Sequence, residues 1–202
     1  MSSTEPNSQK YIHRFVSNRG GPKNLYNMRN LLSERKITNI NVSDKTPDDN
    51  NKIHNHTALM VQAGWSDTLM VMKLLLGKDP QFKLTDLNIT PADPNLKDKN
   101  GYTALHLAII GGKKSYEKVK LLLESGANKN IKSSSEGGGE TPLELVKRTY
   151  NTQDKEKIIE LLTEKSSTSL SNGGTNRNKS KKTHNKFFGR TRKQNVIKKV
   201  DI

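Results

Sequence analysis

The chain has 202 residues, room for one or two domains, but only 31% of them are hydrophobic, against about 45–50% in globular proteins. Its formal net charge is +15, and it has no cysteine, which excludes disulfides, thiolate zinc sites and cysteine nucleophiles and fits a reducing compartment. The first 30 residues contain no apolar run of signal-peptide length, and nothing approaches the ~18 apolar residues of a membrane span. We therefore expect a soluble intracellular protein, cytoplasmic or nuclear.

Three segments repeat one order of residue types: a turn residue, then Thr, then Ala or Pro, then Leu. A second apolar cluster follows each Thr by 17, 18 or 20 residues, at Leu74, Leu121 and Leu161. The chain therefore repeats a unit, and the three copies lie at 55–79, 100–130 and 139–165.

Each unit has the signals of two short helices. Thr57, Thr103 and Thr141 are good N-cap residues, and Pro142 stands just inside the third start, where a missing N–H costs nothing. A glycine such as Gly64 ends the first helix, and a second helix with apolar i, i+3, i+4 spacing follows. Isolated helices shorter than ~12–15 residues are marginal, so the units must stack on one another.

The middle unit resembles the ankyrin repeat family, whose pattern is a turn, G-x-T-P-L-H-x-A, two antiparallel helices and a closing G-A-D-x-N. The matching residues are Asp98, Gly101, Thr103, Leu105, His106, Ala108, Leu121, Leu122, Gly126, Ala127 and Asn130. The resemblance implies an all-α solenoid of short helix pairs joined by turns. It also implies that Thr103 and His106 are hydrogen-bonded, in the middle unit alone, because Met60 and Glu144 take the place of the histidine in the flanking units.

We expect this solenoid to span residues 11–165, as three clear units and a degenerate N-terminal one. In the N-terminal unit, Leu31 and Leu32 belong to an outer helix and Asn41 to its exit. The repeat spacing of 46 and 38 residues exceeds the family's 33 and leaves surplus loops at 78–98 and 132–140, which we expect beside the concave surface. The expected units are about 11–44, 55–97, 98–131 and 139–165, with disorder over 1–10 and 166–202.

No motif predicts catalysis. The stretch GGKKS at 111–115 lacks the first glycine of a phosphate-binding loop, because Leu107 stands in its place. His54 and His56 form an H-x-H pair without a cysteine or an obvious third ligand, so a turn is favoured over a metal site. We predict no enzyme activity, no cofactor and no metal.

The resemblance implies that a partner protein binds along the concave face and the loop fingers. Trp65, the only tryptophan, follows the first helix of its unit; it is either a binding hot spot or packed against the next repeat or a loop. The apolar positions of the first helices either form an exposed stripe or are covered by neighbouring loops. The predicted binding residues are Val61, Trp65, Lys99, Asn100, Tyr102, Leu107, Ile110, Leu145 and Arg148.

Residues 166–202 carry 10 basic and 1 acidic side chain, or +9 of the net charge of +15. Their Ser-, Asn-, Gly- and Lys-rich composition cannot bury enough apolar surface to offset the entropy of ordering. Four interpretations are open: a solubilising tail, a nuclear address recognised by an import receptor, a nucleic-acid-binding segment in which Phe187 and Phe188 stack on bases, and a membrane-surface contact. The basic residues are Lys179, Lys181, Lys182, Lys186, Arg190, Arg192 and Lys193, followed by Lys198 and Lys199.

We therefore predict a monomeric, non-enzymatic protein-interaction module. Two alternatives are a nucleic-acid-associated protein that uses the basic tail, and a decoy that mimics an ankyrin inhibitor of a host. The abundant Asn and Lys, the few repeats and the basic tail resemble ankyrin proteins of large DNA viruses or protists, in which case the protein would act inside a host cell.

Overall fold

The computed structural model describes residues 22–45, 51–149 and 154–164. The described part is all-α, as the sequence predicts: it contains seven α-helices, one 3₁₀ turn and a single isolated β-bridge, between Ser43 and Thr57. None of these helices combines the length and the apolar character that crossing a bilayer requires. The basic tail lies outside the described residues.

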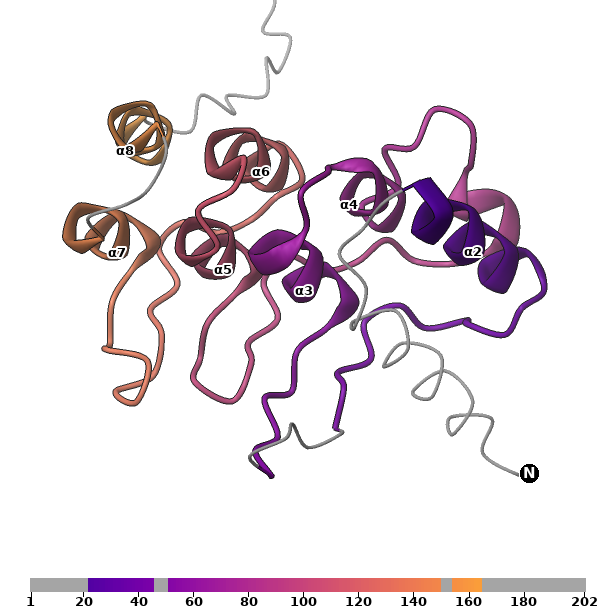
Figure 1. Ribbon diagram of the computed structural model, residues 1–202, viewed down its shortest axis with the longest axis horizontal. Coiled ribbons are helices and arrows are strands. Elements are labelled where there is room, and N and C mark those ends of the chain that lie inside the picture. The colour runs from indigo at the N-terminus through magenta and orange to yellow at the C-terminus, as the bar shows by residue number, and fades with distance from the viewer. Residues whose placement is uncertain (1–21, 46–50, 150–153, 165–202) are drawn as a thin grey trace, which may run out of the picture. The chain divides into compact units, whose positions relative to one another are not determined.

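The helices form two rows (Figure 1). Inner helices α3 (Ala58–Trp65), α5 (Ala104–Ile110) and α7 (Pro142–Arg148) lie in one row, and α3 packs on α5 and α5 on α7. Outer helices α4 (Met70–Leu75), α6 (Ser115–Leu123) and α8 (Lys155–Thr163) form the other, with α6 packed on α8. No helix in either row exceeds nine residues, so each depends on its neighbours for stability.

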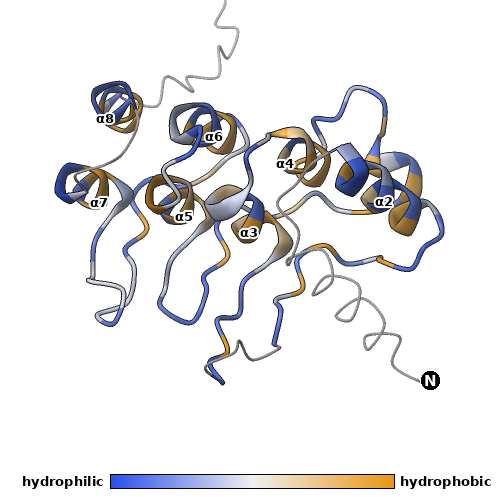
Figure 2. Cartoon of the chain, viewed as in Figure 1, coloured by the Kyte–Doolittle hydropathy of each residue, from blue (hydrophilic) through white to orange (hydrophobic). Residues whose placement is uncertain are grey.

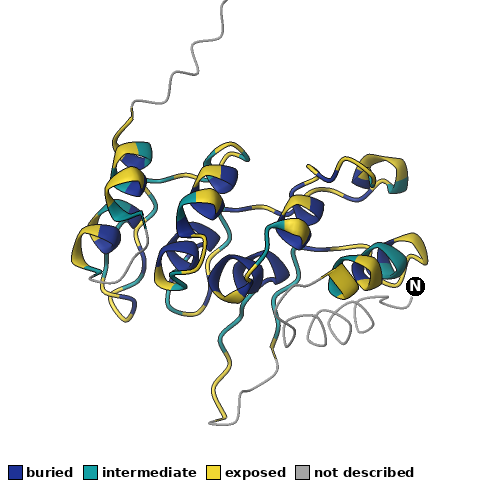
Figure 3. Cartoon of the chain, turned by 45° about the horizontal axis from the view of Figure 1, so that its top comes forward, coloured by how far each residue is buried: buried dark blue, intermediate teal, exposed yellow. Residues whose placement is uncertain are grey.

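The inner and outer helices each carry hydrophobic residues (Figure 2) and buried residues (Figure 3), and the buried hydrophobic residues of both rows form one cluster. The core is built mainly from leucines, isoleucines, valines and alanines of the inner and outer helices; Leu59, Leu74, Leu105 and Leu122, for example, are fully buried. Each repeat therefore contributes its apolar residues to one continuous core, which is the energetic basis of a solenoid.

Helix α2 (Pro22–Ser33) packs against α4 and contributes Met28 and Leu32 to the core. The predicted outer-helix pair Leu31 and Leu32 lies in this helix. Residues 11–21, where the expected unit would begin, lie outside the described residues.

Asparagine side chains connect the exit turns that follow the outer helices. The Asn41 Oδ1 atom accepts the backbone N–H of Asp93 at 2.7 Å, and the Asn95 Oδ1 atom accepts the backbone N–H of Asn128 at 2.7 Å. The same bond thus recurs from one unit to the next and sets the register of the exit turns.

The long loop of the second unit leaves an outer helix. The bond from the Ala92 N–H to the Leu75 carbonyl (2.8 Å) matches that from the Ala127 N–H to the Leu122 carbonyl (3.0 Å), so the surplus residues lie between Leu75 and Ala92. They contain the 3₁₀ turn η1 (Leu84–Leu87).

The surplus residues pack near α2 and not beside the fingers (Figure 1). Leu84 and Ile89 are buried, and Asp79 accepts two hydrogen bonds at 2.7 Å from the Arg29 guanidinium of α2. The expectation that this loop borders the concave surface is therefore wrong for these residues, because the insertion follows the outer helix.

Lys118 of α6 is a fully buried cation. Its Nζ atom donates a 2.8 Å hydrogen bond to the carbonyl of Ala63 in the last turn of α3, where backbone carbonyls have no partner within the helix. Burial lowers the pKa of Lys118 to about 8, since the ammonium is removed from water.

The buried lysine predicts a pH dependence of stability. The unfolded chain keeps the Lys118 proton up to its ordinary pKa of 10.5, whereas the folded chain releases it near 8, so the free energy of unfolding should rise with pH in that window. We expect a rise of about 1–2 kcal/mol between about pH 8 and 9.5 that is missing in Lys118→Met. Urea unfolding of both proteins at both pH values measures it, and equal slopes would contradict it.

The backbone contact between α3 and the end of α5 predicts unequal effects of two glycine substitutions. A Cβ atom on Gly111 would lie 1.8 Å from the carbonyl oxygen of Gly64, whereas a Cβ on Gly64 would meet Leu107 at an ordinary 3.6 Å. Gly111→Ala should therefore destabilise the protein by about 2–3 kcal/mol, and Gly64→Ala, in the helix, by less than about 1 kcal/mol. Thermal unfolding compares the two, and similar losses would show that the backbones are not in contact.

Candidate functional site

The inner helices all begin with a threonine N-cap completed by the side chain three residues later. Thr57 is paired with Met60, Thr103 with His106 and Thr141 with Glu144, so each cap and its partner bond one another's backbone N–H. A thioether, an imidazole and a carboxylate thus perform the same local task. The Thr–His bond occurs in the middle unit alone, as the resemblance implies.

His106 also connects its helix to the next finger. Its Nδ1 atom accepts the backbone N–H of Thr103 at 3.1 Å, so Nε2 carries the proton and donates to the carbonyl of Glu140 at 3.0 Å. Burial lowers the pKa of His106, which keeps the ring neutral and suited to this pair of bonds.

The turns that precede the inner helices form three fingers, which the structure describes at residues 42–45 with 51–57, at 97–103 and at 132–141. Asp98 organises the second finger, because its Oδ1 atom accepts the N–H groups of Asn100 (2.9 Å) and Tyr102 (2.8 Å). Its Oδ2 atom lies 3.2 Å from Nε2 of His56 in the first finger. The Lys99 N–H donates to the carbonyl of His54 at 3.0 Å and forms a second link between these fingers.

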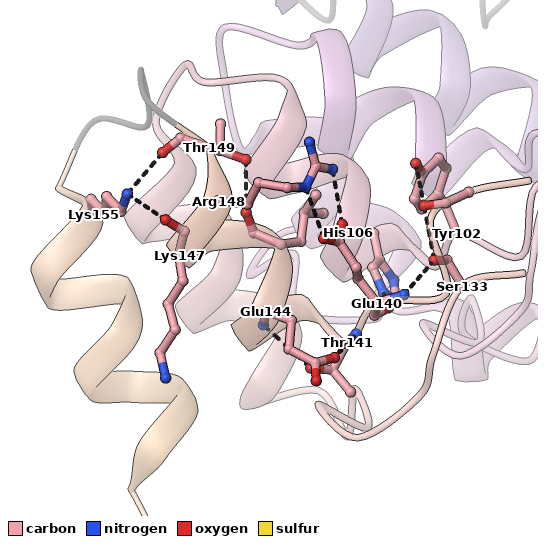
Figure 4. Close-up of polar contacts among 12 residues, drawn as sticks. Tyr102, His106, Ser133, Glu140, Thr141, Glu144, Lys147, Arg148, Thr149 and Lys155 are labelled. Carbon is pink, nitrogen blue, oxygen red and sulfur yellow. Dashed lines mark hydrogen bonds and ion pairs between the residues drawn. The ribbon is translucent and has the colours of Figure 1, made fainter. Parts of the chain in front are cut away.

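The third finger is bonded to the second (Figure 4). The Tyr102 hydroxyl donates to the carbonyl of Gly137 at 2.7 Å, and the N–H of Ser134 donates to the carbonyl of Asn100 at 2.9 Å. A Cβ atom on Gly101 would lie 2.3 Å from the Ser134 nitrogen, and one on Gly137 would lie 2.4 Å from the Asn100 oxygen. The two fingers therefore approach as closely as only glycine allows.

Arg148, at the end of α7, forms two 2.8 Å hydrogen bonds with the Glu140 carboxylate (Figure 4). The bonds from Arg148 lower the pKa of Glu140, and Glu140 in turn raises the pKa of Arg148. Because the backbone carbonyl of Glu140 also accepts from His106, this residue links α5, α7 and the third finger.

Two apolar side chains emerge where the inner helices end. Residues 58–64 of α3 are all buried, yet Trp65 is 50% exposed; residues 104–109 of α5 are all buried, yet Ile110 is 47% exposed. Trp65 and Ile110 are the sequence neighbours of Gly64 and Gly111, whose backbones are in contact. The ring of His56 lies 5.1 Å from Trp65 and is stacked on His54 at 5.2 Å.

The predicted binding residues divide into buried and accessible groups. Val61, Leu107 and Leu145 are buried at 5% exposure or less, so they belong to the core and form no exposed stripe. Lys99, Ile110, Trp65 and Arg148 are exposed, and Asn100 and Tyr102 are half-buried. The predicted tail residues lie outside the described part of the chain.

Sequence reasoning treated His54 and His56 as a solvated turn and missed their contact with Trp65. The H-x-H spacing of the two histidines is visible in the sequence, but only the fold shows that Trp65 lies beside them. The metal interpretation gains no support: no group of three or more potential ligands occurs among the residues the structure describes. Glu140 was missed for the same reason, because its partners His106 and Arg148 come from two other elements.

Comparison with known proteins gives matches of two kinds, one to a family model and one to solved structures. A family model of three ankyrin repeats matches residues 17–133 and 68–172. Among solved structures, the crystal structure of EF0377, an ankyrin repeat protein, has 22% sequence identity and a TM-score of 0.48, and the match covers 76% of this chain. This chain spans 62% of that one, which is less than two thirds of its length. No curated protein matches.

The neutral, bridging His106 predicts a loss of stability in acid. Below the ordinary pKa of 6.5 the unfolded chain binds a proton that the folded ring resists, so the free energy of unfolding falls as the pH decreases through this value. His106→Gln should be about 1–3 kcal/mol less stable at about pH 7.5, because the bonds of Thr103 and Glu140 are weakened, and should lose less between about pH 7.5 and 5.5. Urea unfolding at both pH values tests this; parallel losses would show that His106 titrates normally.

Proposed function

The chain belongs to the ankyrin repeat family, whose repeats are generally non-enzymatic modules for protein–protein interaction, and we propose that it holds a partner protein against the ends of its inner helices and the adjacent fingers. The observation that carries this proposal is the abrupt change from burial to exposure at Trp65 and Ile110. Apolar side chains exposed at corresponding ends of two packed helices form a candidate contact patch.

The surroundings of the patch favour binding over simple packing. Trp65 is braced by His56, which is itself held by the buried carboxylate of Asp98. A tryptophan on such a rigid support loses little conformational entropy when a partner covers it, and tryptophan is enriched among binding hot spots.

The fingers supply the polar part of the proposed surface. Lys99 is exposed and Asn100 partly exposed on the second finger, whose backbone is fixed by Asp98 and by the third finger. Tyr102 has its hydroxyl committed to Gly137, so its role is to hold the second finger against the third. Arg148 presents a guanidinium already paired with Glu140.

A second candidate function rests on the charge of the tail. Residues 166–202 hold 10 basic side chains against 1 acidic, with Phe187 and Phe188 among them. Such a segment could neutralise phosphates, which would make binding steeply salt-dependent and insensitive to sequence.

One experiment tests the binding surface. Full-length protein, Trp65→Ala and Tyr26→Ala are used to capture partners from nuclease-treated lysate, with mass spectrometry as the readout; Tyr26 is a 65% exposed aromatic on α2 and serves as the control. We expect Trp65→Ala to weaken capture of the same partner by about 1 kcal/mol or more and Tyr26→Ala to leave it unchanged. Equal capture by all three would refute the proposed surface.

A second experiment distinguishes binding by the tail from binding by the repeats. The truncated protein 1–165 and the full-length protein are each used for capture from untreated and from nuclease-treated lysate. Capture that survives both truncation and nuclease assigns the function to the repeats. Capture that requires both the tail and intact nucleic acid assigns it to the basic segment.

A further inference from the structure

Carboxylates near the exposed ends of α3 and α5 are already committed to partners within the protein. Asp67 pairs with Lys113 at 3.0 Å, and Glu140 is held by Arg148. Asp98 is only 8% exposed and accepts bonds from two backbone N–H groups and His56. These acids therefore contribute little attraction for a cationic partner.

Lysines at both ends of α5 are not paired with a carboxylate in the described part of the chain. Lys99 is exposed on the second finger, which leads into α5, and Lys114 is exposed in the loop that leaves it. Lys97 donates to the carbonyl of Lys132 and not to a carboxylate. Within the described part of the chain, none of Lys97, Lys99 and Lys114 is in an ion pair with an acid.

One residue of the apolar patch, Ile110, lies between Lys99 and Lys114 along the chain, and the other, Trp65, comes from α3. Helix α5 has seven residues, so it separates the two lysine-bearing turns by about 10 Å. Ile110 is the last residue of α5, and Trp65 follows Gly64, whose backbone contacts Gly111. The surface thus combines an apolar patch at the C-terminal end of α5 with an exposed lysine beyond each end of this helix.

We propose that this surface takes an acidic peptide segment of the partner, with an apolar residue on Trp65 and Ile110 and carboxylates directed at Lys99 and Lys114. The inference rests on the proposed function and names the chemistry of the partner. A basic segment would face uncompensated lysines, which is unfavourable, whereas complementary charge speeds encounter and fixes the register of the apolar anchor.

The test begins with selection of random peptides of about 12 residues on the full-length protein. The enriched peptides are synthesised without tryptophan and titrated while the emission of Trp65 is followed. Because Trp65 is the only tryptophan, peptides that bind elsewhere, including the basic tail, leave this signal unchanged. Each peptide is also titrated into Lys99→Glu and Lys120→Glu; Lys120 is an exposed lysine of α6 and serves as the charge-matched control.

We expect the enriched peptides to be acidic, to contain an apolar residue and to shift the Trp65 emission. Lys99→Glu should lower the affinity of these peptides about five-fold or more, and added salt should also lower it. Lys120→Glu should change the affinity by less than about two-fold.

Three results would overturn the inference. Neutral or basic peptides that shift the Trp65 emission would refute the acidic partner but leave the proposed binding surface in place. Enrichment of only those peptides that leave the Trp65 emission unchanged would refute both the acidic partner and the proposed binding surface. Failure to enrich any peptide would refute recognition of a short segment.

Discussion

The backbone contact between Gly64 and Gly111 sets how closely α3 approaches α5, and much of the surface depends on that distance. A side chain at Gly111 would occupy the space of a carbonyl oxygen, so the two backbones meet here with no side chain between them. At this spacing the first and second fingers bond through His54 and Lys99, and the exit turns bond through Asn95 and Asn128. Trp65 and Ile110 emerge together because each is one residue from the contact.

Stacking of short helices leaves many backbone groups to be satisfied by side chains. The N-terminal N–H groups are met by three capping boxes with different chemistry, and carbonyls near the C-terminal ends are met by lysines of outer helices. Lys118 donates to Ala63, and Lys155 donates to Lys147 and Thr149. The two lysines differ in the free-energy cost of desolvation. Lys118 is fully buried and its pKa is lowered, whereas Lys155 retains contact with water.

The fold was accessible from the sequence because its signals are local. Thr57, Thr103 and Thr141 mark helix starts that the structure confirms, and the apolar spacing after them marks the outer helices. The position of the long loop was not accessible, because spacing between threonines gives the number of surplus residues and not the side of the unit on which they leave. Only the hydrogen bond between Ala92 and Leu75, which closes the insertion, shows this.

The candidate site was accessible in part, for a related reason. Family position alone could not decide whether an inner-helix residue is exposed, since that depends on how closely the next helix packs. Close packing at Gly111 buries Val61 and Leu107 yet leaves the adjoining helix ends uncovered. His56 joined the site only because Asp98, from a different finger, orients it toward Trp65. The exposed tryptophan thus depends on contacts within its own unit and with the next one, and a rigid support of this kind is what allows one side chain to contribute strongly to binding.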